Sequence, residues 1–310
     1  MKISVVGAGV MGPGIAQVFL MGGHQVTLTD ISEKALENGS KNISYVLEQM
    51  YEKGIIKISP EKMMEQLTLT TELKDAVCDA SVVVEAIPER LELKKNLYQQ
   101  LDQYCKEDAI IASNTSSLPL PEIFPDFRKG NFCVAHFFNP PPLIPLVELV
   151  KNDDADEKQV ALLKEILESC GKTVVVLNKF VKGFLINRLQ TALSREAMHL
   201  FEENVVSAED LDKAVRASIG YKSVWQGFFE TLDYIGLDTV KLTNEIIFPD
   251  LFNGTAGSEL VVDMVNKGKL GVKTGEGFYK YNKNDLIESQ KDRTEKLLEQ
   301  LKLWNRFETE

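Results

Sequence analysis

The sequence predicts an α/β fold in which a doubly wound, largely parallel sheet domain is followed by an all-α C-terminal domain. In the first part of the chain, short and nearly continuous apolar runs alternate with longer amphipathic stretches. A glycine-rich turn joins the first apolar run to the first helical stretch, and the pattern becomes mostly helical after Lys182. Apolar runs of this kind are typical of parallel strands covered by helices on both faces.

Five segments have the apolar, β-rich character of buried strands, and three segments between them have the length and spacing of helices. The expected strands are Ile3–Val6, Gln25–Thr29, Ser81–Ile87, Ala109–Ala112 and Phe132–Ala135. The expected helices are Gly14–Met21, Glu33–Tyr51 and Glu89–Lys106. Strand and helix thus alternate as a doubly wound sheet requires.

The chain is expected to form two domains, residues 1–182 and 183–310. A helical hairpin at about residues 43–67, broken at Gly54 and Ser59-Pro60, is too long for an ordinary connection and is expected to project from the first domain. The second domain is expected to open with a long helix over Gly183–Glu203. An extra helix is expected from about residue 283, because apolar residues recur there at helical spacing.

Composition indicates a globular protein that does not bind nucleic acid. With 46 acidic and 35 basic side chains, the net charge of −11 repels phosphate backbones. The four cysteines lie far apart and contain no CxxC pair, which favours free thiols over disulfides or a zinc site, so no metal is expected. We find no apolar run long enough to span a bilayer and no targeting segment, and we expect a cytoplasmic protein with no membrane partner.

A GxGxxG motif predicts a dinucleotide site in the first domain. It reads Gly7-Ala-Gly9-Val10-Met11-Gly12 and lies directly after the first strand and before the first helix. The first glycine permits the turn, the second lets the backbone approach a pyrophosphate, and the third allows close helix packing. Since strand, turn and helix are all in place, the motif indicates a Rossmann-like domain rather than a chance recurrence of glycine.

Asp30 ends the second strand, 18 residues after Gly12. A carboxylate at this position accepts hydrogen bonds from ribose hydroxyls and repels the 2′-phosphate of NADP. The sequence therefore predicts NAD as the cofactor; the alternative is a structural turn followed by a solvated aspartate.

Of the three histidines, His136 is the candidate general base. His24 lies in a turn and His199 within a polar helical stretch, where we expect it at the surface. His136 directly follows an apolar strand, at the edge where doubly wound sheets bind ligands. A proline-rich loop and a returning apolar run then bring Glu148 back toward it, and a carboxylate so placed fixes the tautomer of the imidazole. A lone histidine at a strand end is nevertheless more often structural than catalytic.

Four motifs, two of which contain His136 and Glu148, together favour a catalytic function. They are Ser113-Asn-Thr-Ser-Ser-Leu118, His136-Phe-Phe-Asn-Pro140, Leu146-Val-Glu148 and Gly183-Phe-Leu-Ile-Asn-Arg188, in this order. The set resembles the short-chain L-3-hydroxyacyl-CoA dehydrogenase family, which includes bacterial 3-hydroxybutyryl-CoA dehydrogenases. The resemblance runs from residue 2 to about Tyr281 and leaves the last 30 or so residues outside it.

The resemblance implies a role for each matching residue. His136 would be the general base, Glu148 would orient it, and Ser116 and Asn187 would hydrogen-bond the substrate oxygen. The residues that match cofactor contacts of the family are Glu89, Lys94 and Asn114, in addition to Gly7, Gly9, Val10, Met11, Gly12 and Asp30. Singly, Ser116 could cap a helix and Asn187 could be an ordinary polar residue on a helix face. A non-catalytic NAD-binding protein is disfavoured because all four catalytic types are present.

The resemblance implies oxidation of an L-3-hydroxyacyl-CoA, with 3-hydroxybutyryl-CoA as the favoured substrate and a homodimer as the expected assembly. In the family the projecting hairpin grips CoA through a serine and a lysine. Lys53 matches the lysine and is expected to bind substrate, whereas Val46 stands in place of the serine. A related branch resembles L-gulonate 3-dehydrogenase, lambda-crystallin and L-carnitine dehydrogenases. A free 3-hydroxy acid therefore remains the alternative substrate.

Overall fold

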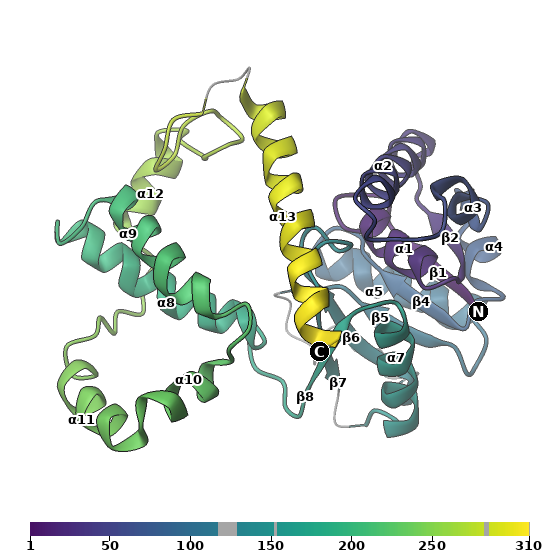
Figure 1. Ribbon diagram of the computed structural model, residues 1–310. Helices are drawn as coiled ribbons and strands as arrows, with labels where there is room; N and C mark the ends of the chain where they lie inside the picture. The colour runs from purple at the N-terminus through teal and green to yellow at the C-terminus, as the bar shows by residue number, and fades with distance from the viewer. Residues whose placement is uncertain (117–128, 152–153, 282–284, 310) are drawn as a thin grey trace. The chain divides into compact units, whose positions relative to one another are not determined.

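The chain consists of two compact units, Met1–Ile186 and Asn187–Glu310. A computed structural model describes residues 1–116, 129–151, 154–281 and 285–309 (Figure 1). The division falls four residues beyond Lys182, where the sequence suggested it. The reason is Phe184, which is buried in the core of the first unit, so the connection to the second unit begins only after it.

An eight-stranded sheet forms the centre of the first unit (Figure 1). Its strands are β1 (Lys2–Val6), β2 (Gln25–Thr29), β3 (Leu67–Thr70), β4 (Val82–Glu85), β5 (Ile110–Ser113), β6 (Phe132–Phe137), β7 (Leu146–Lys151) and β8 (Thr173–Leu177). Their order is β3-β2-β1-β4-β5-β6-β7-β8, and every described pair is parallel except β6 with β7. The first six strands follow the classic dinucleotide-binding order, which confirms the predicted fold class.

Helices cover both faces of this sheet. They are α1 (Gly12–Met21), α2 (Glu33–Glu52), α3 (Pro60–Met64), α4 (Leu73–Val77), α5 (Leu91–Tyr104), the short η1 (Lys129–Asn131) and α7 (Glu157–Ser169). Helices α1, α2 and α7 share one apolar core with the sheet, while α4 and α5 share another. Alternate strand residues enter the two cores because successive side chains of a strand point to opposite faces. The predicted hairpin consists of the second half of α2, a turn at Gly54 with φ 69° and α3. Its residues Ile43, Leu47 and Met63 are buried in the core shared with α1 and the sheet, so this part of the segment packs on the first unit.

The second unit is helical. Its elements are α8 (Ile186–Glu202, entered from the first unit), α9 (Ala208–Val215), η2 (Arg216–Gly220), α10 (Phe228–Ile235), α11 (Leu237–Ile247), α12 (Glu259–Asn266) and α13 (Asp285–Thr309). Ser207 caps α9 by accepting a hydrogen bond of 3.1 Å from the Asp210 N–H. The described helices contain no segment long and apolar enough to cross a bilayer.

Candidate active site

The glycine-rich turn between β1 and α1 is shaped to receive a pyrophosphate. A Cβ atom on Gly7, whose φ is 107°, would lie 2.7 Å from the carbonyl oxygen of Ala86, and one on Gly12 would lie 1.7 Å from that of Gly7. Both positions therefore exclude any side chain. A Cβ on Gly9 would meet nothing within 4 Å, and Val10 beside it is 82% exposed. The turn is thus closed on the protein side and open toward a ligand at the N-terminus of α1, as dinucleotide binding requires.

Asp30 is held at the end of β2 by two backbone groups. Its Oδ2 accepts from the Ala8 N–H at 2.8 Å and its Oδ1 from the Ser32 N–H at 2.9 Å. The carboxylate thereby links the glycine-rich turn to the start of α2 and is fixed in orientation. Ile31, which the sequence analysis did not single out, is 98% exposed directly after it. It offers an apolar surface next to the predicted ribose ligand.

His136 and Glu148 form a directly opposed pair across the antiparallel strands β6 and β7. His136 Nδ1 lies 2.8 Å from Glu148 Oε2, and the two residues are 6% and 0% exposed. The imidazole packs between the rings of Phe138 and Phe184, with centroid distances of 4.6 and 5.3 Å. Since Nδ1 is engaged by the carboxylate, Nε2 is the nitrogen left to exchange a proton with a ligand.

Two backbone amides hold the second oxygen of this carboxylate. Glu148 Oε1 accepts from the N–H groups of Leu185 at 3.1 Å and Ile186 at 2.8 Å. Gly183 and Phe184, just before them, both have left-handed backbone conformations with φ of 80° and 51°. Such a turn aims successive N–H groups at one anion, and the N-terminus of α8 adds favourable dipole charge. The Gly183-Phe184 turn explains how a fully buried carboxylate remains an acceptor facing His136.

A second buried carboxylate, Glu85 at the end of β4, organises the neighbouring strand ends. Its Oε1 accepts from Lys94 Nζ at 2.6 Å and the Ile87 N–H at 2.8 Å, and its Oε2 from Tyr98 at 2.7 Å and Ser113 at 2.6 Å. Desolvation and the adjacent Glu85 charge raise the pKa of Tyr98 well above its ordinary value, which keeps its hydroxyl a donor. Glu85 is thus fully supplied with donors, as a buried charge must be.

Glu89 connects this cluster to the loop that follows β5. Its Oε2 lies 3.3 Å from Lys94 Nζ, while its Oε1 accepts from the Thr115 hydroxyl at 2.5 Å and the Ser116 N–H at 3.0 Å. Lys94 is only 1% exposed and bridges the two glutamates, so its amine is oriented by the protein. Ser116 is therefore fixed through its backbone. Ser117 and Leu118 of the same motif lie outside the described residues.

Asn114 joins the ends of two strands. Its Oδ1 accepts from the Phe137 N–H at 2.9 Å, which ties the loop after β5 to the residue following His136. Its amide nitrogen remains the group able to face a cofactor. The structure thereby brings Asn114, Ser116 and Glu89 to the carboxyl edge of the sheet that also carries His136.

Lys172 was missed by the sequence analysis, because lysine is rarely buried. It is 7% exposed, and its Nζ donates to the carbonyl oxygens of Pro141, at a short distance, and of Ile144 at 3.0 Å. Burial lowers its pKa to about 8. The turn that it holds links β6 to β7, and Pro141 also contacts Gly14 of α1 closely. The loop between β6 and β7 is thus anchored to the helix that begins at the glycine-rich turn.

The remaining candidate residues lie elsewhere in the chain. Lys53 is half-buried and ends α2 at the tip of the hairpin, with Val46 on the same helix. Asn187 is the first residue of the second unit and lines a groove of about 1160 Å³ along α8. The prediction that His199 is a surface residue was wrong: it is half-buried and stacks on Phe252 at 4.6 Å.

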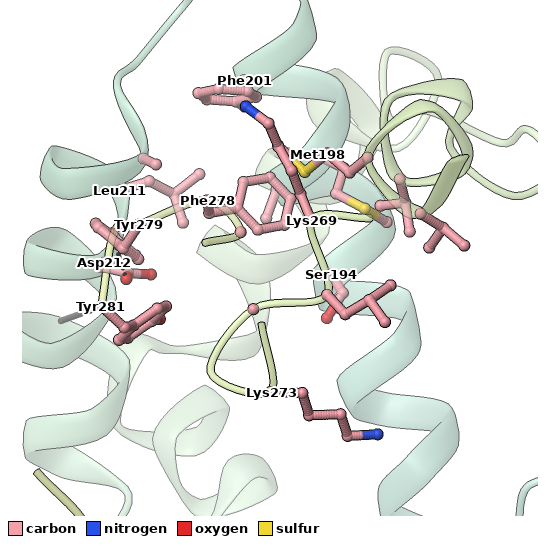
Figure 2. A pocket seen from close by; sticks show the side chains of 18 residues that line it. Ser194, Met198, Phe201, Leu211, Asp212, Lys269, Lys273, Phe278, Tyr279 and Tyr281 are labelled. Atoms are coloured by element: carbon pink, nitrogen blue, oxygen red, sulfur yellow. Dashed lines mark hydrogen bonds between the residues drawn. The ribbon is translucent and has the colours of Figure 1, made fainter. Parts of the chain in front are cut away.

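An apolar hollow of about 760 Å³ lies wholly within the second unit (Figure 2). Its wall combines side chains of α8, α9 and α12 with the turn over residues 269–281. The predicted catalytic residues are not among those that line it. The hollow therefore involves none of the residues that were predicted to take part in catalysis.

Comparison with known proteins agrees with this geometry. Residues 2–180 match the family model of the 3-hydroxyacyl-CoA dehydrogenase NAD binding domain, and residues 183–281 match that of the 3-hydroxyacyl-CoA dehydrogenase C-terminal domain. Helix α13 follows the end of the second match.

Three enzymes illustrate the range of relatives. The chain is 38% identical to the mitochondrial hydroxyacyl-coenzyme A dehydrogenase of Rattus norvegicus, over 90% of both chains. It is 33% identical to the 5-formyl-3-hydroxy-2-methylpyridine 4-carboxylate 5-dehydrogenase of Mesorhizobium japonicum, over 96% of both. A solved structure of an enzyme with that activity, described as an NAD⁺-dependent dismutase, superimposes with a TM-score of 0.90 and 31% identity over 98% of both chains. The (S)-3-hydroxybutyryl-CoA dehydrogenase of Ralstonia eutropha gives 0.74 and 29% identity, over 91% of this chain and 99% of that one.

The two family models together span most of the chain. They agree with the glycine-rich turn between β1 and α1 and with the His136–Glu148 pair at the edge of the sheet. The chain therefore belongs to the 3-hydroxyacyl-CoA dehydrogenase family and is an NAD-dependent oxidoreductase.

Proposed function

We propose that this chain oxidises the 3-hydroxyl group of an L-3-hydroxyacyl-CoA, such as 3-hydroxybutyryl-CoA, to the ketone, and catalyses the reverse reduction. The observation that carries the proposal is the buried His136–Glu148 pair, in which two backbone amides fix the carboxylate and Nε2 is left for the substrate. A base oriented in this way is what removal of an alcohol proton requires.

Each site residue then has a defined task. His136 Nε2 takes the hydroxyl proton during oxidation and returns it during reduction, while Glu148 stabilises the imidazolium. Ser116 and Asn187 hydrogen-bond the reacting oxygen. NAD held at the glycine-rich turn would supply the acceptor for the hydride that leaves the substrate carbon. The glycine-rich turn and Asp30 bind its pyrophosphate and ribose, and the network of Glu85, Glu89 and Lys94 holds the loop that carries Ser116.

The acyl-CoA class is supported by the relatives named for it and by Lys53 at the hairpin tip, a cation suited to a phosphate of CoA. A second substrate class, a carboxylate without CoA, is favoured by two observations. The pyridine-carboxylate dehydrogenase superimposes on 98% of this chain, so the superimposed part includes residues of the C-terminal helix α13. In addition, Val46 stands where a CoA-binding serine is expected.

The test is turnover of NADH at fixed enzyme concentration with acetoacetyl-CoA, acetoacetate, dehydrocarnitine and a keto acid derived from gulonate. We expect fast turnover with acetoacetyl-CoA alone. In the same assay His136→Ala should abolish turnover, while its Kd for NADH, measured in a separate binding titration, should stay nearly unchanged. Equal loss of turnover and NADH binding would make His136 a structural residue. Turnover restricted to free acids would replace the acyl-CoA proposal with the second class.

We further propose that the second unit mediates a homodimer. Several of its largest apolar side chains are 75–80% exposed in the single chain, which is more than a monomer of this size ordinarily presents. The most exposed are Phe228, Phe229, Tyr234 and Ile246. Light scattering should give twice the 34.8 kDa of one chain, and a mass of one chain would refute the proposal. The cytoplasmic location stays a prediction, which fractionation of cells that express the protein would test.

A further inference from the structure

One stripe of residues runs along α8 from Asn187 into the apolar hollow. Its members are Asn187, Thr191, Ser194, Met198 and Phe201, separated by alternating steps of four and three residues. This spacing places all five on one face of a helix. Along the stripe the chemistry changes from an amide through two hydroxyls to a thioether and an aromatic ring.

Two cavities meet on this stripe. The groove of about 1160 Å³ is lined by the stripe residues from Asn187 to Met198, by the polar Gln190, Arg195 and Glu202 of the same helix, and by the segment over residues 252–259. The hollow of about 760 Å³ is lined by Ser194, Met198 and Phe201. Ser194 and Met198 border both cavities, so the groove and the hollow adjoin at these two residues of α8, which are labelled in Figure 2.

The groove has a built wall. The segment opposite α8 is tied to it by hydrogen bonds from the Phe252 N–H to Glu196 at 2.9 Å and from the Ser258 hydroxyl to Glu202 at 2.7 Å. The stacking of Phe252 on His199 adds an apolar contact. A Cβ atom on Gly257, which lines the groove, would meet nothing within 4 Å, so the passage is open there.

The far end is suited to hydrocarbon. Phe201 and Phe278 meet edge to face at 6.0 Å, and alanine, valine, leucine and methionine side chains make up about half of the remaining wall, which also includes Lys273. The polar pairs at its border are already satisfied, since Tyr279 donates to Asp212 at 2.7 Å and Lys269 pairs with Glu276 at 2.8 Å. The volume lies within the range of about 300–1,000 Å³ that is usual for small-molecule sites.

We propose that groove and hollow form an acyl channel, in which the alkyl chain of the substrate runs from the reacting carbon beside Asn187, past Ser194, into the hollow. The inference rests on the proposed function, because Asn187 marks the reacting end only if it binds the substrate oxygen. Such a channel gives the enzyme a preference for substrates with long acyl groups.

The helix sets the length at which the preference begins. Ser194 lies seven residues beyond Asn187, which is about 10 Å along the axis at about 1.5 Å per residue. An extended alkyl chain with C–C bonds of about 1.5 Å advances about 1.25 Å per bond, so about eight bonds are needed. Counted from carbon 3, chains of roughly 11 carbons reach the hollow. Each methylene beyond that length gains at most about fourfold in binding.

The test is kcat/KM for 3-ketoacyl-CoA substrates with 4, 8 and 16 carbons in the wild type and three variants of α8. Ser194→Phe closes the junction at an exposed helix position, and Ala197→Phe fills the hollow while leaving the groove open. Ala192→Phe is the matched control, because it places the same ring on the same helix outside both cavities.

We expect the wild type to prefer the 16-carbon over the 8-carbon substrate by at least tenfold. Ser194→Phe and Ala197→Phe should each remove this preference while changing the 4-carbon value less than twofold, and Ala192→Phe should retain it. A flat profile in the wild type, or equal losses at every length in the variants, overturns the channel. A changed mass of Ser194→Phe or Ala197→Phe in light scattering also overturns it, since the hollow would then belong to a contact between chains. Lack of turnover with every acyl-CoA refutes instead the proposed function.

Discussion

The replacement Glu148→Gln tests how the carboxylate controls His136. Glutamine keeps the shape of the side chain, and its amide oxygen should remain where Oε1 is, because the N–H groups of Leu185 and Ile186 both donate there. The NH₂ group must then face His136 Nδ1. Since a donor now meets that nitrogen, the neutral imidazole carries its proton on Nε2 and cannot accept the substrate proton.

The expected loss follows from two contributions. Retaining the productive tautomer would leave two buried donors face to face, at a cost of about 1–3 kcal/mol, and the imidazolium would lose a charge-assisted hydrogen bond of about 1.5–3 kcal/mol. The sum of about 2.5–6 kcal/mol corresponds to a fall of about 10²- to 10⁴-fold in kcat/KM. Oxidation and reduction should fall by the same factor, because the variant does not alter the equilibrium of the reaction.

The assay follows NADH absorbance in both directions, with ¹⁵N NMR of the imidazole to identify its tautomer. Glu165→Gln, an exposed substitution on α7, is the matched control and should keep full activity. A Glu148→Gln enzyme with at least a third of wild-type activity, or with the proton still on Nδ1, would refute this account of the pair.

Three further changes test other parts of the first unit. Asp30→Ala should weaken the preference for NAD over NADP, measured as the ratio of the two kcat/KM values, because the carboxylate that repels a 2′-phosphate is gone; an unchanged ratio would contradict its assigned role. Tyr98→Phe removes one donor from the buried Glu85 and should lower the free energy of unfolding by about 1–3 kcal/mol in denaturant titrations, while the exposed control Tyr45→Phe should have little effect. The lowered pKa of Lys172 means that the folded chain releases this proton near pH 8 and the unfolded chain near 10.5. Between pH 8 and pH 10.5 the unfolded state therefore binds more protons than the folded state. The free energy of unfolding of the wild type, relative to that of Lys172→Met, should rise by about 3 kcal/mol across this pH range. A difference that does not change with pH would place the amine in solvent.

In the first unit, the sequence predicted those helices, strands and turns that are marked by a pattern of consecutive residues. Strand β2 was predicted with its observed bounds, and the glycine-rich turn was recognised because glycine, strand and helix stand next to one another in the chain. Strands β3 and β8 were not predicted. Strand β3 is short, partly exposed and alternates leucine with threonine, so it lacks the apolar run that marks a central strand. Strand β8 does contain such a run, from Val174 to Leu177, and the sequence-based prediction overlooked it.

The candidate site likewise contains residues whose arrangement could be predicted from the sequence and others whose arrangement could not. The pairing of His136 with Glu148 was predictable, because a strand, a loop and a returning strand bring the two residues together. The amides of Leu185 and Ile186 were not, because backbone N–H groups carry no residue signature and their direction depends on the left-handed turn at Gly183 and Phe184. Lys94 was assigned to the cofactor by resemblance, whereas its burial between two glutamates becomes visible only in the folded chain.

The position of the His136–Glu148 pair in a hairpin determines which changes of the surrounding chain would separate the two side chains. His136 faces Glu148 because of the register between β6 and β7, which ten backbone positions fix in five matched pairs. The connecting loop can therefore change in length or sequence without separating the two side chains, provided the register persists. A slip of a single residue would turn one of them to the opposite face of the sheet. Under the proposed function, the acid–base pair therefore depends on the pairing of β6 with β7 and not on the loop that connects them.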